Sequence, residues 1–246
     1  MKRPLIEACV DSYASAMAAG RAGADRLELC AHLVIGGTTP THALFRQVQR
    51  GSGVPINVLI RPRFGDFLYT EPELEEMCEE IAAFRDLGAN GVVIGALTPD
   101  GELDLAQMRR MMACAGQMEV TLHRAFDMTR DPRQALEAVI RTGCRRVLTS
   151  GGRNTAQEGI GTLRALAAQA AGRIEVMAGS GVGPSNARLL AATGVDALHF
   201  SARREREGAM RFRNPQVSMG GCAGVPEYSV TDADETLVRK LLAKLE

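Results

Sequence analysis

Short apolar runs alternate along this chain with longer stretches in which apolar and polar residues follow a helical period. In four places a helical stretch stops at a glycine, and an apolar run starts within three residues; the glycines are Gly23, Gly88, Gly143 and Gly194. Glycine is favoured just past the end of a helix because it adopts left-handed backbone angles easily. The spacing of these glycines suits two strand–helix units and predicts further strands between them.

Apolar runs without helical periodicity do lie between these glycines, at Leu5–Val10, Ile56–Arg61, Met118–His123 and Ile174–Ala178. Helix starts separate the runs: Asp131 suits an N-cap with Pro132 behind it, and Pro72 precedes another helical period. Eight strands alternating with helices predict an α/β fold, a single (βα)8 TIM barrel. An open doubly wound sheet is the alternative.

The end of the chain departs from this alternation. The last strand is expected near Ala197–Phe200, and a stretch rich in Arg, Gly and Met then runs from Arg203 to Val230. A connection of this length suits a lid or an oligomer contact, so a homo-oligomer is one expectation. Thr231 is predicted to cap a closing helix with one apolar stripe. We therefore expect one domain over 1–246, in which 203–246 form a C-terminal extension and closing helix.

Composition narrows the class of protein. Of the 246 residues 46% are hydrophobic and 24% charged, which is ordinary for a globular protein, and 29 basic residues balance 29 acidic ones. This balance gives no support to nucleic acid binding. Glu7 interrupts the first apolar stretch, and no run reaches the ~18 apolar residues of a membrane span. Six cysteines without a CxxC pair suggest reduced thiols, so we expect a cytoplasmic protein away from membranes.

Polar residues gather at the predicted C-terminal ends of the strands, where barrel enzymes build their active sites. Glu7 with Cys9, and Glu28 with Cys30, each share one strand face because residues two apart point the same way. Buried polar groups need partners, so this set indicates a site. The alternative is a buried ion-pair network in which Arg61 compensates a carboxylate. The remaining strand-end residues are Arg63, His123, Arg124, Asp127, His199 and Ser201.

Several chemistries fit these residues. Two thiolates with an imidazole suit Cu(I), whereas carboxylate with imidazole suits Mn, Mg or Zn. Alternatively, the two cysteines are small inert core residues. An enzyme, metal-dependent or metal-free, is a further alternative: Glu7, Glu28 and His123 are candidate acids and bases for an isomerase or lyase. Structural or incidental roles suffice for the other four cysteines, Cys78, Cys114, Cys144 and Cys222.

Glycine-rich segments after the sixth and seventh strands indicate an anion site, since barrels often bind phosphate there through backbone amides. The alternative is that these glycines only turn a strand into a helix. A small anionic or phosphorylated ligand is therefore expected, with these binding residues: Arg61, Arg63, Asp127, Ser150, Gly151, Gly179, Gly181 and Ser201.

Three segments carry a resemblance to a known family: Arg61–Tyr69 (RPRFGDFLY), Thr121–Asp127 (TLHRAFD) and Arg146–Gly151 (RVLTSG). They resemble signature segments of the CutC family, and the likeness covers nearly the whole chain apart from the tail. It implies a cytoplasmic TIM barrel named for copper homeostasis, in which copper binding and cysteine ligands have been suggested for some members. Carried to this chain, it implies a copper ion, Cu(I), held by Cys9 and Cys30 with His123 nearby.

Overall fold

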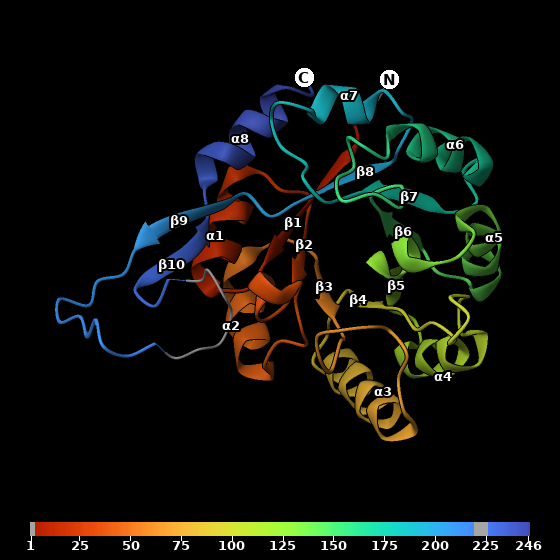
Figure 1. Ribbon diagram of the computed structural model, residues 1–246, viewed down its shortest axis with the longest axis horizontal. Helices are drawn as coiled ribbons and strands as arrows, with labels where there is room; N and C mark the ends of the chain where they lie inside the picture. Colours follow the sequence, from red (N-terminus) through yellow and green to blue (C-terminus); the bar gives the residue numbers. More distant parts are fainter. Residues whose placement is uncertain (1–2, 219–225) are drawn as a thin grey trace.

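The computed structural model describes residues 3–218 and 226–246, and its core is a closed barrel of parallel strands (Figure 1). The strands follow one another around the barrel in chain order, and the eighth pairs with the first. This closure confirms the predicted TIM barrel and excludes the open sheet. The strands are β1 (Leu5–Val10), β2 (Arg26–Leu29), β3 (Ile56–Leu59), β4 (Gly91–Ile94), β5 (Glu119–Leu122), β6 (Arg146–Thr149), β7 (Glu175–Ala178) and β8 (Ala197–Phe200).

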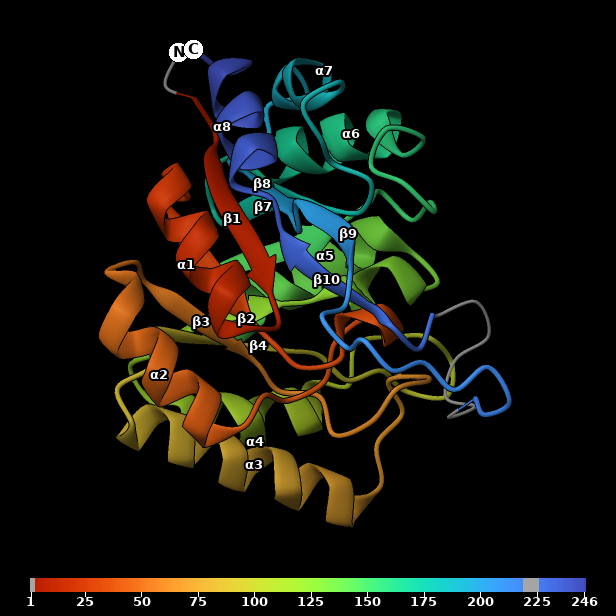
Figure 2. The same cartoon turned by 90° about the vertical axis from the view of Figure 1, so that its left-hand side faces the viewer.

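Helices connect successive strands and surround the barrel (Figures 1 and 2). The predicted helix start at Asp131 is confirmed, since its side chain accepts from the amides of Arg133 and Gln134. All four repeat glycines have positive φ, between 83° and 96°. The helices are α1 (Tyr13–Ala22), α2 (His42–Ser52), α3 (Glu71–Asp86), α4 (Leu105–Ala115), α5 (Pro132–Thr142), α6 (Ile160–Ala170), α7 (Ala187–Ala191) and α8 (Glu235–Ala243), with short 3-10 turns at Leu33–Ile35 and Arg124–Met128.

The strands at Ile56, Met118 and Ile174 are slightly shorter than predicted, whereas Leu5–Val10 has its predicted bounds. At the end of β3 the amide of Arg61 donates to the side chain of Thr39. The chain has therefore left the sheet pattern and entered the loop that carries Arg61. Arg61, two residues beyond the end of β3, thus stands at the rim of the barrel.

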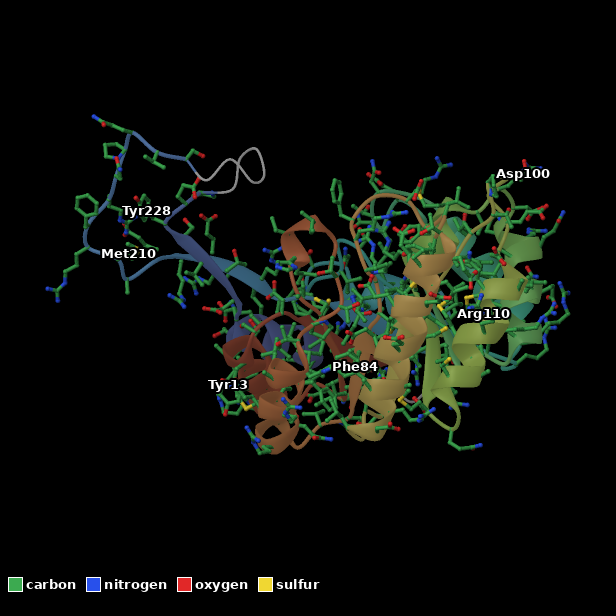
Figure 3. All side chains as sticks on the ribbon, turned by 90° about the horizontal axis from the view of Figure 1, so that it is seen from below. Tyr13, Phe84, Asp100, Arg110, Met210 and Tyr228 are labelled. Atoms are coloured by element: carbon green, nitrogen blue, oxygen red, sulfur yellow. The ribbon has the colours of Figure 1, made fainter. Side chains whose placement is uncertain are left out.

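The C-terminal extension contains a hairpin that the sequence pattern did not predict. Strands β9 (Arg203–Glu207) and β10 (Ser229–Ala233) pair antiparallel and project from the barrel, with Met210 and Tyr228 beyond their outer ends (Figures 1 and 3). Met210 is 63% exposed. An oligomer contact at this extension stays a prediction. Cys222 lies outside the described residues.

The predicted cap of the closing helix was wrong. Thr231 lies within β10, where it is paired with Glu205. Asp234, the first residue beyond the strand, caps α8 instead, because its carboxylate accepts from the amides of Thr236 and Leu237. The predicted apolar stripe does pack, since Val238 and Leu241 are fully buried. Among the described residues, no helix is both long and apolar enough to cross a bilayer.

Candidate functional site

A polar layer crosses β1, β2 and β8 inside the barrel. The strand register aligns Glu7 with Arg26 on one side and with His199 on the other, and it aligns Cys9 with Glu28. Because side chains alternate along a strand, residues two apart on β1 point to the same interior. Barrel closure between β8 and β1 therefore brings five polar side chains into one group.

Glu7 lies at the centre of this layer and is fully buried. Arg26 Nε donates to Glu7 Oε2 at 2.5 Å, Asn57 Nδ2 donates to the same oxygen at 3.4 Å, and His199 Nδ1 lies 2.9 Å from Glu7 Oε1. Burial alone would raise the pKa of Glu7, but His199 and Arg26 outweigh it and lower the pKa to about 2. Glu7 is therefore an anion that orients His199.

The expectation that Arg61 compensates a carboxylate was wrong, because Arg26 fills that role. Arg61 donates instead to the carbonyl oxygens of Ile35, Gly37 and Gly65, at 3.0 to 3.4 Å. Its position beyond the end of β3 places it at the rim, away from the carboxylate of Glu7. The guanidinium thus holds together two loops at the mouth of the barrel.

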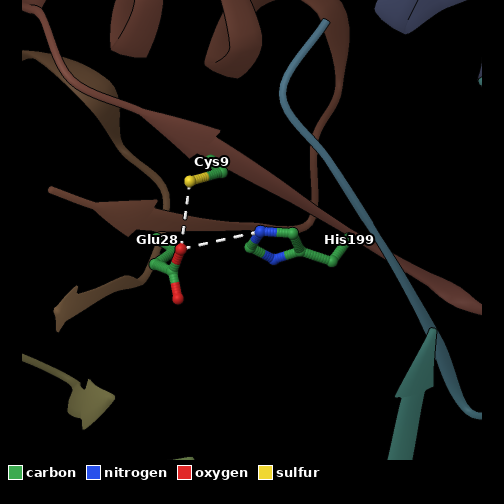
Figure 4. Close-up of side chains that lie close together, drawn as sticks. All are labelled: Cys9, Glu28 and His199. Atoms are coloured by element: carbon green, nitrogen blue, oxygen red, sulfur yellow. Dashed lines mark hydrogen bonds and ion pairs between the residues drawn. The ribbon is translucent and has the colours of Figure 1, made fainter. Parts of the chain in front are cut away.

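Cys9, Glu28 and His199 form a group that could hold a metal ion (Figure 4). Cys9 Sγ donates to Glu28 Oε2 at 3.0 Å, and His199 Nε2 lies 3.6 Å from that oxygen. One donor atom from each residue lies within 4.8 Å of the others. Cys30 Sγ adds a second sulfur, 4.0 Å from Cys9 Sγ.

The protonation states in this group depend on one another. The hydrogen bond with Cys30, followed by burial, raises the pKa of Cys9 well above its ordinary value. Burial also raises the pKa of Glu28. For His199 burial acts the other way, but the carboxylates of Glu28 and Glu7 outweigh it and raise the pKa. The group therefore holds a protonated thiol beside groups that can exchange its proton.

His123 lies outside this donor group. It follows β5, is buried, and its Nδ1 accepts from the amide of Ala125 at 3.1 Å. Burial and the charge of Arg61 lower its pKa to about 3. The structure thus brings Cys9 and Cys30 together as expected, and it places His199 rather than His123 beside them.

A cavity of about 490 Å³ opens above the group, at the C-terminal ends of the strands. We call it the barrel-mouth cavity. Its volume lies in the range of ~300–1,000 Å³ that is usual for small-molecule sites. The polar and charged residues that line it are Cys9, Glu28, Arg61, His123, Arg124, Asp127, Ser180, His199 and Ser201.

The structure places the predicted anion-binding residues in different surroundings. Asp127 Oδ1 accepts from the backbone amides of Ser150 and Gly152, both at 3.0 Å, and from the hydroxyl of Thr149. A carboxylate of the protein itself therefore occupies the amides after β6. The amide of Gly151 donates to the hydroxyl of Thr149 at 2.9 Å. Ligand binding by Asp127, Ser150 and Gly151 stays a prediction.

The other predicted ligand residues have different surroundings. Gly181 and Ser201 line the barrel-mouth cavity. Gly179 packs so closely that an added Cβ would lie 2.5 Å from Leu148 Cδ1. Arg63 donates to Glu73 Oε1 at 2.5 Å, in a loop beside α3. Of these four, therefore, only Gly181 and Ser201 are in direct reach of a ligand in the cavity.

The roles of two residues in the polar layer were not predicted from the sequence. Arg26 shares a strand face with Glu28, and a periodicity of two could have found it. The role of His199 was harder to find, because its partners come from β1 and β2 at the opposite end of the chain. Only the closure of the barrel makes them neighbours.

Comparisons with known proteins agree with this architecture. The CutC family model matches residues 4–204. A copper homeostasis protein cutC homolog from Homo sapiens is 46% identical over 97% of this chain and 88% of that protein. A CutC family protein from Mesorhizobium japonicum is 47% identical, over 98% of this chain and 93% of its own length.

A solved structure gives the same result. A CutC protein from Streptococcus agalactiae superposes with a TM-score of 0.77 at 30% identity, covering 80% of this chain and 98% of its own. The residues matched by the family model, 4–204, include the eight strands of the barrel and the residues of the candidate site. The chain therefore belongs to the CutC family.

Proposed function

We propose that this chain is a cytoplasmic copper homeostasis protein that binds a copper ion at the mouth of its barrel. The observation that carries the proposal is the separation of 4.0 Å between Cys9 Sγ and Cys30 Sγ. Two thiolates each ~2.3 Å from one metal ion would be about 3.8 Å apart at a tetrahedral angle and about 4.6 Å apart in a line. The two sulfurs thus need little movement to share one ion.

The chemistry of the donors also supports copper. Sulfur ligands favour Cu(I), and imidazole binds copper in either state. His199 is the histidine we propose as third ligand, because it belongs to the same compact group as Cys9. Glu28 Oε2 accepts from the Cys9 thiol, so it can take the proton of Cys9 when the metal binds, while the proton of Cys30 is released to solvent. The name of the human relative, a copper homeostasis protein cutC homolog, supports copper as the metal.

The test is the affinity of the purified protein for Cu(I) under anaerobic conditions. Replacing Cys9 and Cys30 together by Ser should abolish binding of one copper ion per chain. The matched control replaces Cys78 and Cys114, which lie on α3 and α4 away from the cavity, and it should bind copper as the wild type does. Equal affinity in the two double variants would contradict the proposed ligands.

A second candidate function is supported by the size of the cavity. A volume of about 490 Å³ exceeds the space that one ion needs, and Glu28 and His199 face it as a proton-exchanging pair. We propose as the alternative an enzyme, an isomerase or lyase, that acts on a small anionic molecule with Glu28 as acid or base. Glu28→Gln should then keep the fold but remove turnover or ligand binding. Undiminished activity would exclude this role for Glu28.

A further inference from the structure

Two buried nitrogen atoms at the barrel-mouth cavity have no hydrogen-bond partner within the described part of the chain. They are Arg61 Nε and His123 Nε2, and both residues line the cavity. Buried polar groups in proteins are almost always paired, because an unpaired one costs about 1–3 kcal/mol. Two such atoms at one cavity therefore point to a ligand that completes them.

The tautomer of His123 follows from its contacts. Its Nδ1 must be an acceptor, because the amide of Ala125 donates to it at 3.1 Å. The single proton of the neutral ring is then on Nε2, which makes this atom a donor. Gly95 lets the ring lie close to β4, since an added Cβ would be 2.7 Å from His123 Cε1. His123 is thus a fixed, neutral donor.

Arg61 adds a positive charge to the same wall. Its terminal nitrogens bind backbone carbonyls, which leave the charge of the guanidinium uncompensated. The guanidinium lies 5.2 Å from the ring centre of Phe67, and that ring centre is 4.9 Å from the ring centre of His123. The three side chains form one wall of the cavity.

The other residues that line the cavity indicate the chemistry of the rest of the ligand. Arg124 and Asp127 are paired with each other at 2.8 Å, and His199 Nε2 lies 3.6 Å from Glu28 Oε2, so these two pairs add little net charge. Apolar side chains supply much of the other surface: Leu33, Ile35, Leu59, Leu148, Val182 and Phe200. A cavity with one uncompensated cation, two unpaired donors and an apolar lining suits an anion that carries an organic body.

We propose that the wall formed by Arg61, Phe67 and His123 binds the carboxylate of a small organic acid. The carboxylate oxygens accept from Arg61 Nε and His123 Nε2, and the rest of the molecule extends toward Cys9, Glu28 and His199. This inference rests on the second candidate function and names its substrate class. It does not depend on copper binding.

The test is NMR of protein with ¹⁵N-labelled histidine rings, titrated with pyruvate, succinate and 2-oxobutyrate. We expect the His123 signals to report a neutral Nε2–H ring at pH 7, and at least one acid to shift the Nε2–H signal. His123→Asn keeps an acceptor for the amide of Ala125 but has no donor at Nε2, so it should bind that acid about tenfold more weakly. His42→Asn, outside the cavity, should bind it as the wild type does.

Three results would overturn the inference. The first is an Nδ1–H tautomer of His123, and the second is the absence of a shift with all three acids. The third is a shift with inorganic phosphate alone, which would mean that the wall binds an inorganic anion. Equal affinity for the acid in the wild type and His123→Asn would reject the donor assignment while leaving an organic-acid cavity, and hence the second candidate function, intact. Cu(I) affinity, measured in parallel, tests the copper proposal separately.

Discussion

Glu7 keeps a negative charge inside the barrel because Arg26 and His199 both face its carboxylate. Removing one partner of such a buried group leaves the other charges uncompensated, which typically costs 3–5 kcal/mol. We therefore predict that Glu7→Gln lowers the free energy of unfolding by about 3 kcal/mol or more. Urea denaturation at pH 7 measures this change.

The control for this prediction is Glu235→Gln. Glu235 pairs with Arg21 and Arg239 on the surface, where solvent screens the interaction. We expect little change in its unfolding free energy. If Glu7→Gln were as stable as this control, the ion pairs of Glu7 would not support the barrel.

At the scale of single residues, the sequence predicted which side chains are present at the site better than it predicted their partners. Glu28, Cys9 and Cys30 were found because residues two apart on a strand share a face. The pairing of Glu7 with Arg26 and His199 depends on the register between strands, and nothing within one strand records that register. The ligand role of His123 likewise stays a prediction, because the structure gives it a different neighbourhood from Cys9.

At the scale of elements, the closing helix α8 offers a direct test of its cap. Asp234 accepts from the amides of Thr236 and Leu237, whereas Thr231 lies in the middle of β10. Loss of an N-cap costs about 1 kcal/mol, so Asp234→Ala should lower the unfolding free energy by about that amount. Thr231→Ala should change it less. The reverse order in urea denaturation would return the cap to Thr231.

The elements themselves were largely predictable. Each repeat ends its helix at a glycine that needs a positive φ, and local backbone chemistry of this kind is visible in one sequence. The hairpin of β9 and β10 was missed because its strands are mostly polar. All five residues of Arg203–Glu207 are exposed, and the strand is held by pairing across the hairpin, so no hydrophobic period marks it. Thr231 was misplaced for the same reason.

At the scale of the whole molecule, stability should depend on pH through its buried histidines and carboxylates. Burial and the charge of Arg61 lower the pKa of His123 from its ordinary 6.5 to about 3 in the folded chain. The unfolded chain therefore binds a proton that the folded chain does not, and stability falls as pH drops from 6.5 toward 3. The pKa of Glu7 is lowered from its ordinary 4.5 to about 2, so stability falls further as the pH drops through this range. These two groups both make acid destabilising.

Two other groups make stability fall as the pH rises. The raised pKa of His199 gives stability that is present below 6.5 and is lost as the pH rises through its folded value. The raised pKa of Glu28 likewise gives stability that is lost as the pH rises above 4.5. The total slope mixes these terms, so the wild-type curve alone cannot identify His123.

Comparison of the wild type with His123→Asn isolates the contribution of His123 to the pH dependence of stability, because Asn does not titrate. We predict that the unfolding free energy of the wild type, relative to this variant, falls as the pH is lowered from 6.5 to 4.5, by up to about 1.4 kcal/mol per pH unit. Urea denaturation at pH 7, 6, 5 and 4.5 measures this difference. A constant difference would mean that His123 takes up its proton alike in both states. It would then not be the fixed neutral donor that the contact with Ala125 and the charge of Arg61 require.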